Sequence, residues 1–359
     1  MEIRKELEGK KPYELPRQKK RNYYSQIMQA LTQKHYNHCK QYQNMLKIIN
    51  FNLEEAHEPE EYPFLPVRLF KELELRSVPK TEIVKTMTSS GTTGQQVSKI
   101  YLDKQTSMNQ SAALIRISAD MLGSKRFPML IIDTKSVIKD RKMFSARGAG
   151  ILGFSMLGRD TTYALNEKMQ LDFETVEAFL EKHQGKSILL FGFTYMIWEH
   201  FYKVLKSSSR KLDLSKGILL HGGGFKKLAA EAVDNETYKQ CLKEVCGIER
   251  VCNYYGMVEQ TGSIFMECEC GRLHASNYSD IIIRNPKDFS VCAQGETGLI
   301  QLLSVLPDSY PGHSILSEDL GQIIGEDDCP CGRKGKTFRI LGRIQKAEVR
   351  GCSDTYEKS

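Results

Sequence analysis

Seven consecutive residues combine hydroxyl side chains with glycine, and a lysine follows them. They are Thr88, Ser89, Ser90, Gly91, Thr92, Thr93 and Gly94, with Lys99 after them. Glycine lets backbone N–H groups approach an anion closely, and hydroxyls and a lysine add donors and positive charge. The order is not that of a Walker loop, which needs Gly-Lys-Ser/Thr at a fixed spacing. The segment indicates a phosphate-binding loop of another kind, with a solvated Ser/Thr-Gly loop as the alternative.

Three glycines follow a short apolar run at residues 219–220, in the order His221, Gly222, Gly223 and Gly224. In an α/β sheet, ligands bind beyond the carboxyl ends of the strands, and glycines there let a flat ligand rest against the backbone. The segment therefore indicates a ligand-binding edge, with a plain tight turn after a strand as the alternative.

Three later segments carry side chains that suit a nucleotide. Tyr255 could stack on a base, with Gly256 leaving room beside it, and Glu259 is a hard oxygen ligand of the kind that Mg²⁺ takes next to phosphates. Further on, Asp319 could accept hydrogen bonds from a ribose, and Arg343 could pair with ribose or phosphate. Each segment could also be an ordinary turn or a surface charge, so the order in which they occur carries most of the information.

Two C-x-C pairs are the metal-binding candidates among the ten cysteines. Cys268, Cys270 and His274 form the pattern C-x-C-x₃-H, and Cys329 and Cys331 form the second pair. In a chain without an export signal, such pairs indicate metal ligands sooner than disulfides. Soft ligands of this kind suit tetrahedral zinc in a structural site. Since five candidates compete for four places, we favour Cys268, His274, Cys329 and Cys331, with free thiols as the alternative.

Strand-length apolar runs recur between helical patterns, and these elements must position the side chains above. The runs cover residues 129–132, 187–191, 218–220, 251–254 and 299–303. Such alternation predicts an α/β fold with largely parallel sheets. Apolar residues at helical spacing predict a helix over residues 18–50, and residues 51–80 have the composition of an ordered connector.

Composition and charge exclude several classes of protein. Among the 359 residues, 40% are hydrophobic and 26% charged, which is typical of a soluble globular chain. The net charge of +7 suits a phosphate-rich small molecule as well as a nucleic acid. The first residues are charged, and the longest apolar stretch, Ile188–Trp198, is too short to cross a membrane. We predict a cytoplasmic protein with a small-molecule substrate, no membrane span and no nucleic-acid partner.

The series TSSGTTG, HGGG, YYGMVEQ, SEDLG and LGRI resembles the ordered motifs of the acyl-adenylate-forming enzymes. That superfamily includes acyl-CoA synthetases, luciferases and peptide-synthetase adenylation domains, and the resemblance extends from about residue 80 to 350. More narrowly, residues 310–356 resemble the acyl-protein synthetases, the LuxE-type ligases known from bacterial bioluminescence. In that family a fatty acid is adenylated, moved to a cysteine near the C-terminus and passed to a partner acyl reductase.

The resemblance implies a role for each matching residue, with ATP and Mg²⁺ as cofactors. Residues 88–94 and Lys99 would hold the phosphates, Gly222 to Gly224 with Tyr255 and Gly256 the adenine, Glu259 the Mg²⁺, and Asp319 and Arg343 the ribose. Lys99, Glu259 and Cys352 would act in catalysis. Two departures from the superfamily pattern are the Gln95-Gln96 continuation of the first loop and Val258, which stands where a threonine is usual.

The resemblance also implies a domain organisation. Residues 81–344 would form the large α/β domain of adenylate-forming enzymes, with stacked sheets flanked by helices. Residues 1–80 would be a helical lead-in and connector packed on that core, and residues 345–359 a short tail. The small C-terminal domain of the wider superfamily and its lysine have no counterpart here, and Lys346 is a candidate substitute for that lysine.

Cys352 falls where the resemblance places the acceptor thiol. Arg350 and Lys346 lie close in sequence and would favour the thiolate form, while Gly351 would let the tail move between sites. The predicted function is therefore ATP-dependent activation of a fatty acid to acyl-AMP, transfer to Cys352 as a thioester, and delivery to a long-chain acyl reductase. An ordinary exposed cysteine is the alternative for this residue.

Two other functions remain open at this point. One is a carboxylate–CoA ligase of the phenylacetate type, with CoA as acceptor in place of Cys352. The other is a non-catalytic, nucleotide-binding partner subunit. The candidate segments for an acyl pocket are the apolar runs Gly148–Gly158 and Ile188–Trp198.

Overall fold

A mixed sheet of twelve strands forms the centre of the computed structural model, which describes residues 6–7, 9–89, 96–138 and 146–344. Five strands pair in parallel at one end, in the order β5 (Gly158–Tyr163), β4 (Phe127–Ile131), β6 (Ile188–Phe193), β7 (Gly217–Gly222) and β8 (Arg250–Tyr255). We call this part the parallel half. It holds four of the five apolar runs predicted as strands, and β12 in the other half holds the fifth, so all five are confirmed.

The other half of the sheet is antiparallel, and we call it the antiparallel half. From β8 outwards its order is β9 (Phe265–Glu267), β10 (Leu273–His274), β14 (Lys336–Arg343), β13 (Ser314–Glu326), β12 (Gly298–Ser304) and β11 (Ser279–Arg284). The short strand β1 (Leu65–Pro66) joins β13 in parallel. The expected α/β class is confirmed, but the prediction of largely parallel sheets is wrong, because strands β9 to β14 pair antiparallel. The two halves are joined edge to edge through the β8–β9 pair.

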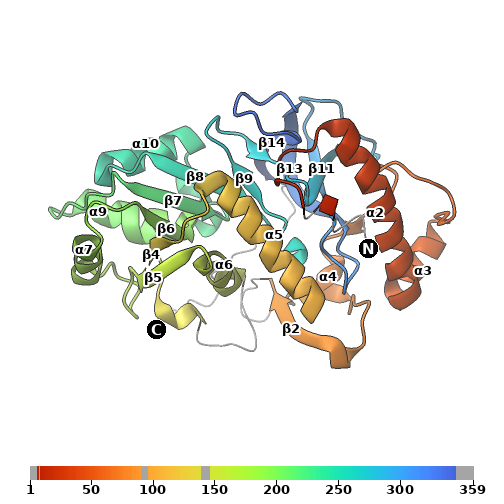
Figure 1. Cartoon of the computed structure of the whole chain (residues 1–359), viewed down its shortest axis with the longest axis horizontal. Coiled ribbons are helices and arrows are strands. Elements are labelled where there is room, and N and C mark those ends of the chain that lie inside the picture. Colours follow the sequence, from red (N-terminus) through yellow and green to blue (C-terminus); the bar gives the residue numbers. More distant parts are fainter. Residues whose placement is uncertain (1–5, 8, 90–95, 139–145, 345–359) are drawn as a thin grey trace.

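A separate hairpin of β2 (Ile83–Thr88) and β3 (Lys99–Asp103) lies beside the main sheet. From it the long helix α5 (Lys104–Leu122) crosses in front of the sheet towards β8 and β9, with α6 (Ala146–Ser155) below it (Figure 1). Further helices cover the parallel half: α7 (Phe173–Lys182), α8 (Thr194–Ile197), α9 (Lys203–Ser207) and α10 (Asn235–Cys246), with a π-helical turn at Trp198–Tyr202.

Local sequence signals explain where several of these helices begin. Asp103, Asp172 and Asp234 stand just before α5, α7 and α10, and each is followed three residues later by a threonine whose backbone N–H it accepts. Such caps satisfy a helix N–H group that has no partner within the helix. Helix α10 ends at Gly247, whose φ of 73° is the left-handed conformation that favours glycine at this position.

The N-terminal segment forms two helices, α2 (Arg17–His38) and α3 (Lys40–Ile48). Most of residues 18–50 are helical as predicted, but the prediction of one continuous helix is wrong. The break is at Cys39, whose backbone is extended. Because of this break, Ile27 of α2 packs in the main core while Leu46 of α3 packs in a second apolar cluster. The connector that follows carries β1 and α4 (Leu69–Glu72).

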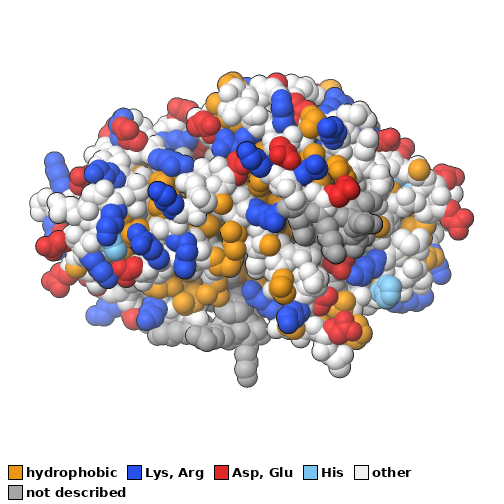
Figure 2. Space-filling view, in the orientation of Figure 1, with side chains coloured by type: hydrophobic (Ala, Val, Ile, Leu, Met, Phe, Trp, Pro, Cys, Tyr) orange, Lys and Arg blue, Asp and Glu red, His pale blue; other side chains and the backbone are white. Residues whose placement is uncertain are grey.

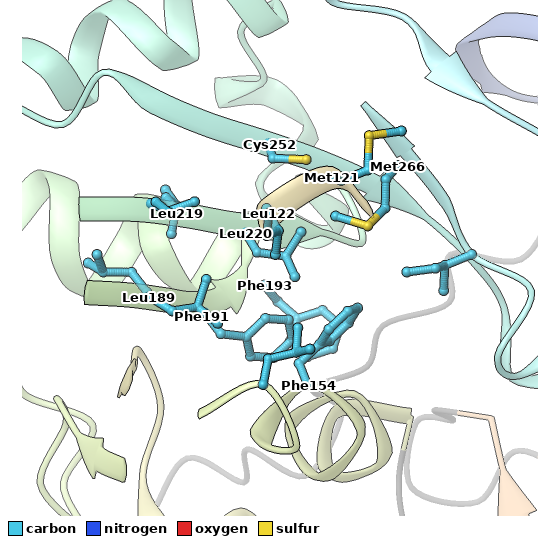
Figure 3. Packing of buried hydrophobic residues seen from close by; sticks show 14 of the residues in the cluster. Met121, Leu122, Phe154, Leu189, Phe191, Phe193, Leu219, Leu220, Cys252 and Met266 are labelled. Atoms are coloured by element: carbon cyan, nitrogen blue, oxygen red, sulfur yellow. The ribbon is translucent and has the colours of Figure 1, made fainter. Parts of the chain in front are cut away.

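The main core lies between the parallel strands and the helices that cover them. Every residue of β6 is buried, as expected for a strand with both faces covered. Figure 3 shows Phe154 of α6 directed at the sheet, where its ring centroid lies 4.8 Å from that of Phe191 and 4.9 Å from that of Tyr254. Burying such a ring stabilises a fold by about 1.5–3 kcal/mol, so α6 is held firmly against the strands.

Candidate active site

The base of the hydroxyl- and glycine-rich loop is held closed by the β2–β3 hairpin. Thr88 and Lys99 are paired across the two strands. Beyond them, Ser89 and Ser98 exchange two hydrogen bonds, of 3.2 Å between backbone groups and 2.9 Å from the Ser98 N–H to the Ser89 hydroxyl. Lys99 is exposed, while Thr88 and Ser89 are buried. The other predicted members of the loop, Ser90, Gly91, Thr92, Thr93 and Gly94, lie outside the described residues.

Three candidate nucleotide-binding residues, far apart in sequence, meet at the junction of the two halves. The Tyr255 hydroxyl, at the end of β8, donates a hydrogen bond of 2.6 Å to Asp319 Oδ2. Asp319 on β13 is paired in register with Arg343 on β14, and Arg343 Nε lies 3.2 Å from Asp319 Oδ1. Arg343 also contacts Glu318 Oε2 at 2.8 Å. Burial, together with the Asp319 charge, raises the pKa of Tyr255 well above its usual value, so the phenol stays a donor.

The glycine triplet lies at the carboxyl end of β7. A Cβ atom on Gly222 would lie 2.5 Å from the Tyr254 carbonyl oxygen, so only glycine allows β7 and β8 to approach this closely. Gly223 and Gly224 have φ values of 84° and 64° as the chain turns away from the strand. Glycine is favoured there because it adopts positive φ without the steric cost that a Cβ atom brings. His221 is buried and bonded to the Thr194 hydroxyl at 3.0 Å, and burial lowers its pKa to about 3.

Glu259 lies in a short turn after β8. It is 3% exposed, and its backbone carbonyl accepts a hydrogen bond of 2.9 Å from Tyr310. The neighbouring Gln260 donates to the carbonyl oxygens of Leu302 and Gly312 at 3.1 and 2.8 Å. These contacts hold the backbone of the turn in place, and a buried carboxylate carried by it is suited to hold a divalent cation.

An apolar cavity of about 280 Å³ lies between α5, α6 and the strands. Residues from the predicted nucleotide segments, Gly223, Gly256, Met257 and Val258, form part of its wall. The rest comes mainly from Lys85, Met87, Leu102, Ser107, Gln110, Ser111, Leu114, Ala149, Gly150, Leu152, Gly153, Phe154, Met156, Phe193, Tyr254, Thr261, Gly262 and Ile264. Figure 2 shows hydrophobic side chains gathered at the centre of the face where Figure 1 has α5 and α6.

The two apolar segments predicted as candidates for an acyl pocket supply part of the lining of this cavity, and other elements supply the rest. The segment Gly148–Gly158 supplies α6 and its lining residues, and Ile188–Trp198 supplies Phe193. The contribution of α5 was missed, although its lining residues Ser107, Gln110, Ser111 and Leu114 have the i, i+3, i+4, i+7 spacing of one helix face. Three of these four residues are polar, and a search for apolar periodicity therefore does not detect them.

A cluster of thiols and one imidazole joins the β9–β10 turn to the β13–β14 loop. The ligand atoms of Cys268, His274, Cys329 and Cys331 all lie within 4.8 Å of one another. Cys268 Sγ is 3.8 Å from Cys329 Sγ, and Cys331 Sγ is 3.4 Å from His274 Nε2. A tetrahedral zinc with Zn–S bonds of about 2.3 Å separates its sulfur ligands by about 3.8 Å, so the group fits that metal. The fifth sequence candidate, Cys270, is exposed.

Neighbouring groups tie this cluster, which we call the thiol knot, to the rest of the molecule. Burial lowers the pKa of His274 to about 4, so its imidazole is neutral and has a lone pair for a metal. Arg333, in the same loop, bonds to Asp120 near the end of α5 at 2.9 Å and to Glu269 at 2.9 Å. The knot is therefore linked to the helix that lines the cavity.

Two sequence-predicted residues of the tail, Cys352 and Lys346, lie outside the described residues. Across the described part of the chain, no helix has both the length and the apolar character needed to cross a bilayer.

The arrangement of strands and helices is that of adenylate-forming ligases. A crystal structure of an open conformation of 2-hydroxyisobutyryl-CoA ligase, in complex with 2-HIB-AMP and CoA, is similar with a TM-score of 0.73 and 16% identity, over 93% of this chain and 72% of that one. The family model of the acyl-protein synthetases, LuxE, matches residues 2–359. The chain therefore belongs to the acyl-protein synthetase family and is a ligase, as the order of its motifs predicted.

Two curated relatives agree with this family. The long-chain-fatty-acid–luciferin-component ligase of Aliivibrio fischeri is 24% identical over 89% of this chain and 84% of its own length. The protein of the same description from Vibrio harveyi is 22% identical over 95% of this chain and 89% of its own length.

Proposed function

We propose that this protein activates a fatty acid with ATP as an acyl-adenylate, transfers the acyl group to the thiol of Cys352, and delivers it from there to a partner acyl reductase. The observation that supports this most strongly is the assembly of Tyr255, Asp319 and Arg343 beside an apolar cavity. A polar edge next to a mainly apolar space suits a reaction that joins a nucleotide to an aliphatic acid.

In the first step, a carboxylate oxygen attacks the α-phosphorus of ATP while the bond to the β-phosphate oxygen breaks and pyrophosphate leaves. Asp319 is the acceptor for the ribose hydroxyls, and Tyr255 and Arg343 fix its orientation. Glu259 would hold Mg²⁺, which supplies charge neutralisation at the phosphates. Lys99 and the loop at residues 88–94 would add further donors to the phosphates.

In the second step, the thiolate sulfur of Cys352 attacks the acyl carbonyl carbon, the bond from that carbon to the phosphate oxygen breaks, and AMP leaves with the electron pair. The thiol proton is lost to solvent before attack. The apolar wall of the cavity protects the mixed anhydride from water between the two steps. The thioester can then pass its acyl group to the reductase.

Intact-protein mass spectrometry tests this proposal. Wild type, Cys352→Ser and a control, Cys292→Ser, are each incubated with ATP, Mg²⁺ and a series of fatty acids. We expect an ATP-dependent, hydroxylamine-labile acyl adduct on wild type and Cys292→Ser, and none on Cys352→Ser. Formation of AMP with no adduct on any form would remove Cys352 from the mechanism, and acylation of added CoA would then support the CoA-ligase alternative.

We also propose that the thiol knot holds a structural zinc ion. The 3.8 Å between the Cys268 and Cys329 sulfur atoms, the gathering of four ligand atoms within 4.8 Å and the neutral imidazole of His274 support this assignment. Zinc would fix the β13–β14 loop, and with it Arg333, against the β9–β10 turn. Metal analysis of the protein purified without chelators should find about one zinc per chain, and less than a tenth of an equivalent would contradict the assignment.

A further inference from the structure

We propose that Thr194 is a positioning residue for nucleotide binding, whose hydroxyl fixes the backbone of the glycine triplet and the imidazole beside it in one arrangement. This inference rests on the proposed function, because it requires that the triplet, Gly222 to Gly224, binds the adenine of ATP. It goes further by naming a residue that lies outside the five sequence motifs, at the end of a different strand.

The Thr194 hydroxyl has two hydrogen-bond partners, and both lie on β7. Its oxygen donates to the Gly222 carbonyl oxygen at 3.0 Å and lies 3.0 Å from His221 Nδ1. Thr194 directly follows Phe193, which is paired with Gly222 in the last register position of β6 with β7. The side chain therefore joins the two strands just beyond the end of their ladder. Thr194 is 5% exposed, so water competes little for these groups.

The direction of this side chain is informative because Thr194 is also the first residue of α8. A threonine at such a position often bonds to the backbone of its own turn. Among the described residues, the hydroxyl of Thr194 instead bonds to partners 27 and 28 positions further along the chain. The side chain therefore stabilises the end of β7 and not the start of its own helix.

The positions of the protons follow from the chemistry of the three groups. A carbonyl oxygen only accepts and a hydroxyl has one proton, so the Thr194 proton points at Gly222. His221 must then donate from Nδ1 to the hydroxyl oxygen. Burial lowers the pKa of His221 to about 3, so the ring is neutral and Nε2 carries no proton. In the described part of the chain Nε2 has no hydrogen-bond partner, so Thr194 selects the tautomer.

The glycine triplet needs an anchor, because glycine has no side chain and loses more conformational freedom on folding than any other residue. Gly222 is confined on the β8 side by the Tyr254 carbonyl oxygen and is bonded on the β6 side to Thr194. Beyond it, no heavy atom of the described residues lies within 4 Å of the place that a Cβ would take on Gly224. The bond to Gly222 is therefore the last side-chain anchor before the triplet leaves the strand.

The packing around His221 does not depend on the hydroxyl. The imidazole stacks on Tyr238 of α10 with centroids 4.6 Å apart, and Tyr238 stacks on Trp198 at 5.8 Å. Valine has nearly the shape of threonine and is also branched at Cβ, so Thr194→Val removes the two hydrogen bonds and keeps this packing. Thr194→Ser keeps the hydroxyl and removes only a methyl group.

Thr337 provides a matched control. It is a buried threonine whose hydroxyl also donates to a glycine carbonyl oxygen, that of Gly325, at 3.2 Å. It lies at the opposite end of β14 from Arg343. Thr337→Val therefore removes a bond of the same kind, and an effect that both variants share reflects the general cost of losing a buried hydroxyl.

Acid-dependent ATP–pyrophosphate exchange tests the role in binding, with each variant first shown to be folded by circular dichroism. We expect Thr194→Val to raise KM for ATP roughly tenfold, the effect of losing one or two buried hydrogen bonds. Both kcat and KM for the acid should change less than about threefold, because Gly223 is the one triplet residue that lines the apolar cavity. Thr194→Ser should keep KM for ATP within about twofold of wild type, and Thr337→Val should change none of these constants.

NMR of protein with ¹⁵N-labelled histidine tests the hydrogen bonds without relying on catalysis. The chain has 8 histidines, and comparison with His221→Gln identifies the signals of His221. At neutral pH we expect the proton on Nδ1 in wild type and in Thr194→Ser. In Thr194→Val the Nε2–H tautomer should appear, because the acceptor that selects the other form is gone.

Three results would overturn the inference alone: an unchanged KM for ATP in Thr194→Val, equal increases in KM for ATP and for the acid, or an Nε2 proton on His221 in wild type. In each case adenylation itself would stand. A lack of acid-dependent exchange in folded wild-type protein would instead overturn the proposed function, and the role of Thr194 with it.

Discussion

The two halves of the sheet each have an apolar core but differ in the strands that form it and in the polar groups buried beside it. In the parallel half, strands such as β6 bury only apolar side chains and glycine, and α5 and α6 pack on them through aromatic and aliphatic contacts. The antiparallel half has an apolar cluster of its own, and it also buries polar groups that are bonded to one another. Arg284 donates to Gln301 at 2.7 Å, and the buried Lys20 lies 3.5 Å from Asp280. This half also contains the thiol knot.

This difference suits the two halves to different roles, one to form a cavity and the other to hold polar side chains in a fixed arrangement. Apolar burial is non-directional and leaves a cavity whose shape depends on side-chain size. Hydrogen bonds and metal ligands are directional, so they can hold Tyr255, Asp319 and Arg343 in one arrangement. We therefore expect the proposed nucleotide-binding side to depend on individual polar contacts and the proposed acyl-binding side to depend on volume.

The largest expected effect comes from removing the zinc ion that we propose for the thiol knot. A tight zinc chelator, or Cys329→Ser, should lower the melting temperature by roughly 10 °C, because loss of a structural zinc removes several kcal/mol from the stability of a chain of this size. Hydrogen exchange should quicken in β9, β10 and the β13–β14 loop before it does so in β4 and β6.

Cys270→Ser is the matched control for that experiment, since Cys270 is exposed and lies beside the ligands. It should change the melting temperature by no more than about 1 °C, as surface substitutions usually do. Equal exchange in both halves after chelation would show that the knot does not stabilise the antiparallel half selectively.

A smaller effect is expected from acid, and it should arise in both halves. Burial lowers the pKa of His221 and of His313 to about 3, with a minor contribution from Lys239 at His221. Their neutral forms therefore stabilise the fold fully above pH 6.5, and this stability is lost as the pH falls towards 3. At pH 5 the cost of keeping each of these two histidines neutral should lower the free energy of unfolding by about 2 kcal/mol relative to pH 7.5.

Urea unfolding of His221→Gln and His313→Gln at the two pH values measures this loss. Each variant should show a pH difference smaller by about 2 kcal/mol than wild type. The exposed His38→Gln should keep the wild-type difference. An unchanged pH difference in both buried variants would mean that other groups cause the acid sensitivity.

The smallest effect is expected from a single hydrogen bond at the junction of the halves. Tyr255→Phe removes the donor to Asp319, and a hydrogen bond to a charged group contributes about 1.5–3 kcal/mol at most. We expect KM for ATP to rise roughly tenfold, with a smaller change in kcat. Tyr62→Phe, which removes a buried hydroxyl remote from these residues, should leave KM unchanged. Equal effects of the two variants would remove Tyr255 from nucleotide binding.

Much of the fold could be predicted from local sequence patterns, because each pattern has a local physical cause. Continuous apolar runs predicted the strands β4, β6, β7, β8 and β12, since buried strands have no polar face. The order of the motifs predicted the family. The two C-x-C pairs and His274 gave five candidate ligands, because few side chains bind soft metals. The four that we favoured are the ones that meet in the thiol knot. The loop at residues 90–94 and Cys352 lie outside the described residues and stay predictions.

Tertiary structure alone decided how these parts meet. The hydrogen bond from Tyr255 to Asp319 joins residues 64 positions apart, and the register of β13 with β14 brings Arg343 to both. The cavity depends on one face of α5 and one face of α6. Neither helix has a sequence pattern that predicts which element it packs against. A pocket is a space between elements, so its size is determined by how those elements pack and not by any one segment of the chain.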